Sequence, residues 1–81
     1  MKASKGQGSL SAMVGEQEAT VLEVRPFGLH GVTYYDVTVQ FSDNTVEQSR
    51  LGPESVPPDL QPGERVIATR VANMVLSLRR A

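Results

Sequence analysis

Residues 32–42 alternate between two kinds of side chain, and this alternation limits the possible folds more than any other feature of the chain. Successive side chains of a β-strand point to opposite faces, so a repeat of two residues predicts a strand with one buried and one solvated face. The odd positions hold Tyr35, Val37, Val39 and Phe41, and the even positions hold Tyr34, Asp36, Thr38 and Gln40.

A reversal of the chain is predicted directly after this strand. Phe41 is followed by Ser42, Asp43, Asn44 and Thr45. Asn and Asp tolerate the left-handed backbone conformation that tight hairpin turns require. We therefore expect residues 45–51 to return as a second strand paired with the first.

Three further segments have the composition of β-strands. Residues 18–25 carry Val21, Leu22 and Val24, and we expect this first strand to end at Pro26, because proline cannot donate to a sheet ladder. Residues 65–71 and 74–80 form two more runs on either side of Ala72 and Asn73, which predicts a closing hairpin.

The connector between residues 51 and 64 is rich in proline and glycine, which excludes a regular helix or strand of any length. We expect an ordered loop with at most one short turn near residues 54–56. Val56 and Leu60 are its large apolar residues, and we expect both to plug the core. Pro62 and Gly63 fit the central positions of a type II turn, so a strand should start directly after them.

The segments together predict an all-β domain. No window shows an apolar helical repeat free of proline or glycine. A three-strand meander, a Pro-rich loop and a closing hairpin would leave two exposed edges if laid flat, so we expect a small five-stranded barrel. The expected core consists of Leu22, Val24, Tyr35, Val37, Val39, Phe41, Val46, Leu60, Val66, Met74, Leu76 and Leu78.

The length of 81 residues allows one small domain. Residues 1–15 contain three glycines, three serines and both lysines of the chain, which is typical of a flexible lead-in, and we assign the domain to residues 16–81. Six arginines against nine carboxylates give the domain a net charge of −3. No apolar run suits a signal or transmembrane segment, so we expect no membrane association and a cytoplasmic location.

The order of the elements resembles a known small barrel. The run from Leu60 through Pro62 and Gly63 to Val66, followed by the alternating Met74, Leu76 and Leu78, is similar to the second half of OB-fold barrels. The resemblance covers about 65 residues and is one of fold. An SH3-like barrel is the alternative, because it also uses a Pro-Gly turn before a closing hairpin.

The resemblance implies a place for a binding face. OB-like barrels bind oligonucleotides or oligosaccharides on their second and third strands, flanked by the loops after strands one and four. Here the first of these loops would be residues 26–31 and the second Ala72 and Asn73. The candidate face consists of Phe27, Leu29, His30, Tyr34, Thr38, Gln40, Arg50 and Asn73.

Catalytic chemistry is poorly supported. His30 is the sole histidine and there is no cysteine, so neither a transition-metal site nor a Cys nucleophile is indicated. A Ser-His-acid arrangement could use only His30, and no nucleophile-elbow pattern is present. We therefore expect no enzyme, no metal and no cofactor.

Two functions from different classes remain. The first is a non-catalytic binding module that contacts another protein or a second copy of itself. The second is a single-strand nucleic-acid binder of OB type, in which Phe27, His30, Tyr34 and Arg50 would stack on or pair with bases. Such binders need aromatic platforms inside a positive groove, and the acidic domain disfavours this second function.

Overall fold

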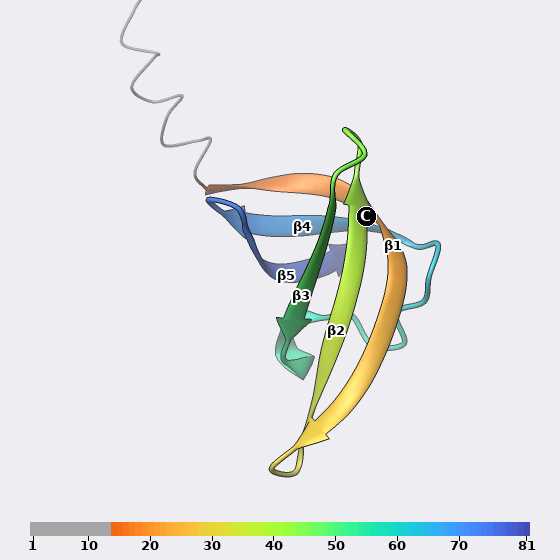
Figure 1. Ribbon diagram of the computed structural model, residues 1–81, viewed down its shortest axis with the longest axis vertical. Helices are drawn as coiled ribbons and strands as arrows, with labels where there is room; N and C mark the ends of the chain where they lie inside the picture. Colours follow the sequence, from red (N-terminus) through yellow and green to blue (C-terminus); the bar gives the residue numbers. More distant parts are fainter. Residues whose placement is uncertain (1–13) are drawn as a thin grey trace, which may run out of the picture.

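The computed structural model describes residues 14–81 and consists of a single five-stranded antiparallel sheet (Figure 1). The strands lie in the order β3-β2-β1-β4-β5. Their bounds are β1 Val14–Leu29, β2 Val32–Phe41, β3 Val46–Leu51, β4 Arg65–Val71 and β5 Met74–Arg80. A single turn of 3-10 helix, Pro53–Ser55, interrupts the connector. The predicted all-β class is confirmed, as are the meander, the Pro-rich loop and the closing hairpin.

The start of the first strand lies upstream of the expected domain boundary. Val14 and Gly15 belong to β1 and pair with Val71 and Arg70. The other residues of the expected flexible lead-in, 1–13, lie outside the described part of the chain.

A long ribbon of two strands projects from the sheet. β1 pairs with β4 only as far as Thr20, and β2 pairs with β3 only from Tyr35 onward. Beyond these points β1 and β2 pair only with each other, and Figure 1 shows them extending past the ends of the other strands. We call residues 24–35 the arm. His30 and Gly31, with φ of 53° and 78°, form its two-residue turn, and positive φ at both positions is typical of type I′ hairpins.

The prediction that the first strand ends at Pro26 is wrong, because β1 continues through it to Leu29. The turn makes Leu29 and Val32 a hydrogen-bonded pair, so Pro26 and Tyr35 form a non-hydrogen-bonded pair. The missing N–H of Pro26 would therefore point away from β2, to the side where β4 has already ended. Proline is tolerated at such an edge position. The expected loop at residues 26–31 is thus a strand end and a tight turn.

The sheet curls but does not close into the expected barrel. β3 and β5, its two outer strands, come within 8 Å of each other between Cα atoms, yet no backbone hydrogen bond joins them. Side chains fill the seam instead. Arg70 of β4 donates hydrogen bonds to Glu47 of β3 and to Gln17 of β1, and its guanidinium carbon lies 4.6 Å from the centre of the Phe41 ring.

The core lies inside the curl of the sheet. Six of the expected core residues are buried, namely Val37, Val39, Phe41, Leu60, Val66 and Leu78, and Val24 and Tyr35 pack against them. Val56 is also buried, so both predicted plugs of the connector reach the core. Buried residues that the expected core omitted are Ala19, Val21, Leu51, Ala68 and Val75.

Four expected core residues are exposed, and the register explains each of them. Leu22 is the extra residue of a bulge in β1, and Leu76 is the extra residue of a bulge in β5. A bulge shifts the alternation by one position, so Met74 is 62% exposed while Val75 is buried. Val46 of β3 pairs with Gln40 of β2, and paired side chains share a face, so Val46 lies on the solvated face of the sheet.

Candidate functional site

The arm carries an apolar strip on the face turned away from the core, which we call its outer face. Phe27 pairs with Tyr34, and Leu29 pairs with Val32, so all four side chains share one face. The rings of Phe27 and Tyr34 are stacked, with centroids 5.6 Å apart and planes 27° apart. Leu29 and Val32 are 50% and 40% exposed. None of the four belongs to the buried core.

Arg50 of β3 holds the base of this strip. Its guanidinium carbon lies 4.1 Å from the centre of the Phe27 ring. Its Nε and Nη2 donate to Oδ1 and Oδ2 of Asp36 at 2.8 and 3.0 Å. The hydrogen bonds from Arg50 lower the pKa of the Asp36 carboxyl below its ordinary value. The two-point contact fixes the plane of the guanidinium, and the guanidinium in turn supports the Phe27 ring.

The structure brings together only part of the predicted binding face. Phe27, Tyr34 and Arg50 are in contact, and Leu29 continues the same strip. His30 is exposed in the turn at the tip of the arm. The remaining predicted residues lie outside the strip.

Thr38 and Gln40 lie half-buried on the outer face of β2, beyond the base of the arm. Asn73 lies in the β4–β5 turn, where it lines a hollow of about 370 Å³ between β3 and β5 together with Arg50 and Met74. The prediction did not include Val32. The two-residue turn at His30-Gly31 pairs Val32 with Leu29, whereas a loop over residues 26–31, as expected from the sequence, gives Val32 no such partner.

The positive charges of the described arginines are all compensated by carboxylates. Each of the six arginines lies within ion-pair distance of a carboxylate. The pairs are Arg25–Glu23, Arg50–Asp36, Arg65–Glu18, Arg70–Glu47, Arg79–Glu16 and Arg80–Glu64. Arg25–Glu23 lies within β1, and the other five pairs join different elements of the fold. Residues 14–81 therefore offer no run of unpaired cations that could follow a phosphate backbone.

A second hollow, of about 250 Å³, lies on the opposite, inner face of the arm. β1 and β2 form one wall and the Pro-rich connector forms the other. Its lining consists of Val24, Pro26, Tyr35, Val56, Pro57, Asp59, Leu60, Gln61 and Pro62. No pattern in the sequence indicates this site, because only the folded path of the connector brings its residues opposite the arm.

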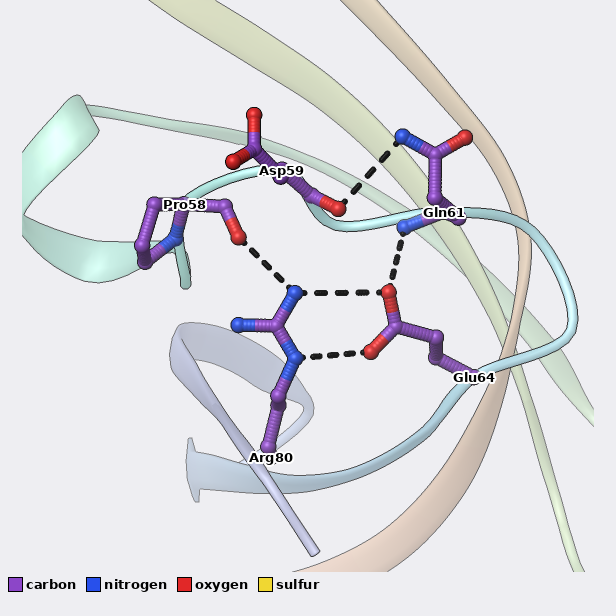
Figure 2. Close-up of polar contacts among 5 residues, drawn as sticks. All are labelled: Pro58, Asp59, Gln61, Glu64 and Arg80. Atoms are coloured by element: carbon purple, nitrogen blue, oxygen red, sulfur yellow. Dashed lines mark hydrogen bonds and ion pairs between the residues drawn. The ribbon is translucent and has the colours of Figure 1, made fainter.

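Arg80 fixes the far end of the connector (Figure 2). Its Nε donates to Oε1 of Glu64 at 2.8 Å, and its Nη2 donates to the carbonyl oxygen of Pro58 at 2.8 Å. The backbone N–H of Gln61 donates to Oε2 of Glu64 at 2.8 Å. The turn itself has the geometry predicted for Pro62 and Gly63, with a Gly63 φ of +94° and a hydrogen bond from the N–H of Glu64 to the carbonyl of Gln61.

The Glu64→Gln variant is expected to be less stable than the native chain at neutral pH and equally stable at about pH 2. Hydrogen bonds from Arg80 and from the Gln61 backbone lower the pKa of Glu64. The charged form therefore stabilises the fold above the ordinary pKa of 4.5, and this contribution is lost as the pH falls through the lowered pKa. Melting temperatures of both proteins between neutral and acid pH measure the difference. A difference that stays constant over this range would contradict the role of Glu64.

Residues 14–81 offer neither a metal cluster nor a membrane-spanning helix. No group of three or more His, Cys, Asp or Glu side chains there is placed to hold a metal ion. No helix in this part of the chain has the length and hydropathy needed to cross a membrane. Comparisons with protein-family models, with curated proteins and with solved structures find no match to this chain.

Proposed function

We propose that the protein is a non-catalytic binding module that contacts another protein through the outer face of its arm. The observation that carries the proposal is the strip of Phe27, Leu29, Val32 and Tyr34 on a projecting ribbon. Exposed apolar residues scattered singly are ordinary, but a continuous apolar strip outside the core marks an interaction surface. Aromatic side chains and arginine are also the residue types enriched at the energetic centres of protein interfaces.

The proposed fold is an OB-type barrel left open between β3 and β5. The connector carries β4 back to lie beside β1, so β4-β1-β2-β3 has the spatial order of a Greek key. OB-folds are partly open five-stranded Greek-key barrels. This strand order supports the OB type over the SH3-like alternative.

Single-strand nucleic-acid binding is the second candidate, favoured by the stacked pair of Phe27 and Tyr34. Aromatic side chains can stack with bases, but this mode of binding also needs a positive groove. Arg50 lies at the aromatic pair, and Asp36 already neutralises it. A chemical-shift titration with mixed single-stranded DNA and RNA at low salt separates the two candidates. Salt-sensitive shifts at Phe27, Tyr34 and Arg50 would favour nucleic acid.

Capture with matched variants tests the proposed function. The native chain is compared with Leu29→Ser/Val32→Ser, which removes two exposed apolar side chains from the arm, and with Met74→Ser/Leu76→Ser, which removes two from β5. We expect a protein captured by the native chain to be lost with the arm variant and retained with the β5 variant. Sedimentation velocity of the three proteins detects a second copy as the partner. Equal capture and equal sedimentation of all three would refute the proposal.

A further inference from the structure

We infer that the hollow on the inner face of the arm is a docking site for one apolar side chain, aromatic or aliphatic, from an extended segment of a partner protein, flanked by a basic residue. This inference rests on the proposed function that the module binds protein. It assigns a second contact on the face opposite the apolar strip.

The lining defines the kind of group that fits. Val24, Pro26 and Tyr35 come from the arm, and Pro57, Leu60 and Pro62 come from the connector. These six side chains are mostly hydrocarbon and include three proline rings that are conformationally fixed, while Asp59 and Gln61 add polar groups to the lining. The volume of about 250 Å³ is smaller than most small-molecule sites, which span roughly 300–1,000 Å³, but exceeds the roughly 150 Å³ of an apolar cavity that holds benzene. A single large side chain therefore suits the hollow better than a cofactor.

The hollow is held open by contacts that do not involve its occupant. Arg80 ties Glu64 to the carbonyl of Pro58, and Glu64 accepts the backbone N–H of Gln61 (Figure 2). The connector is thus braced on both sides of Asp59. Because the wall is already ordered, binding loses little conformational entropy, and even a single side chain can bind with measurable affinity.

The charge at the rim selects a basic neighbour for that side chain. Arg80 and Glu64 neutralise each other, whereas Asp59 belongs to no ion pair among the described residues. Figure 2 shows its carboxylate directed away from the Arg80 guanidinium. Asp59 lines the hollow, so the net charge at the rim is negative. The Gln61 side chain, also in the lining, donates one N–H to the carbonyl of Asp59, and its amide oxygen can accept a hydrogen bond from the backbone of an extended segment.

A chemical-shift titration of the labelled full chain with short peptides tests the inference. The probe is a blocked pentapeptide with phenylalanine at the centre and arginine on either side. One control peptide has alanine at the centre, and the other has glutamate in place of arginine. We expect binding in the millimolar range, with shifts at Val24, Tyr35 and Leu60. The alanine peptide should bind at least about tenfold more weakly than the probe. The glutamate peptide should also bind more weakly than the probe, because its charge has the same sign as that of Asp59.

Two variants locate the binding. Val24→Phe should fill the hollow and abolish the shifts, with its melting curve checking that the fold is retained. Asp59→Asn removes only the charge, because asparagine also tolerates the positive φ of 58° at this position. This variant should bind the arginine-flanked peptide about two- to fivefold more weakly. Leu29→Ser/Val32→Ser on the opposite face should leave peptide binding unchanged.

The inference and the proposed function fail in distinguishable ways. Absence of shifts up to about 5 mM peptide, or shifts confined to the outer face, would overturn the docking site while leaving partner capture untouched. Equal binding of the phenylalanine and alanine peptides would overturn it as well. The opposite result is also possible: the peptide shifts the signals of the hollow, but partner capture does not depend on Leu29 and Val32. That result would refute the proposed outer-face contact and leave the docking site in place.

Discussion

The Val39→Asp variant is expected to be unfolded at room temperature. Val39 is 2% exposed and lies in the centre of β2, between β1 and β3. An aspartate there would place an unpaired charge in a core with no partner for it, at a cost on the order of several kcal/mol. A domain of this size has a free energy of unfolding of only about 5 kcal/mol, so this cost removes most or all of it.

Circular dichroism and amide chemical-shift dispersion measure the outcome. Gln40→Asp is the matched control, because the same residue is introduced one position further along β2, on the outer face. It should retain a cooperative unfolding transition, with a loss of about 1 kcal/mol or less. A folded Val39→Asp protein with native thermal stability would show that the register of β2 is wrong.

The Arg70→Ala variant is expected to lose roughly 2–3 kcal/mol of stability. Arg70 and Glu47 are only 21% and 24% exposed at their side chains, and Arg70 also donates to Gln17 and packs on Phe41. Truncation would leave the half-buried Glu47 carboxylate unpaired at the seam between β3 and β5. The loss of the aliphatic part of the arginine would add an unfilled space beside Phe41. Urea unfolding followed by fluorescence or circular dichroism gives the change in free energy.

A double variant separates charge from packing. Arg70→Met with Glu47→Gln removes both charges and keeps most of the side-chain volume. It also removes the Arg70 Nε, which is buried without a hydrogen-bond partner within the described residues. We expect this protein to recover much of the lost stability, because the cost of breaking such a pair is mainly that of the charge left behind. A loss below about 0.5 kcal/mol for Arg70→Ala would show that the seam does not depend on the ion pair.

Parts of the fold could be predicted because their signals are local. The alternation in residues 32–42 identified β2 and its buried face. The turn at Asp43 and Asn44 was predictable from residue type, and the structure has Asn44 at a φ of 71° with the Asp43 carboxylate accepting from the Thr45 N–H. Val56 and Leu60 could be identified as core plugs because few other apolar residues lie in the connector.

Other parts depend on pairing between strands, which periodicity does not contain. The bulges at Leu22 and Leu76 shift the inward set by one residue, so a strict repeat of two places Met74 and Leu76 inside. Pro26 ends a strand only if its N–H side needs a partner, and here β4 has already ended. Whether the curled sheet closes depends on the path of β3 and β5 in space.

The candidate site divides in the same way. Phe27, Tyr34 and Arg50 could be singled out as exposed residues of suitable chemistry, but their contact follows from the arm and its register. The neutralisation of Arg50 by Asp36 is also a consequence of their cross-strand pairing. The hollow beneath the arm combines residues from two distant segments, and no local pattern indicates their meeting.

A chemical-shift map of the labelled 81-residue chain during addition of the captured partner tests the central claim most directly. If the outer face of the arm is the contact surface, the largest changes should fall on Phe27, Leu29, Val32 and Tyr34, and the Leu29→Ser/Val32→Ser variant should show none of them. If the partner is a second copy of the chain, raising the concentration of the protein alone should shift the same four residues. Unchanged arm signals, with shifts confined to β4 and β5, would contradict the claim.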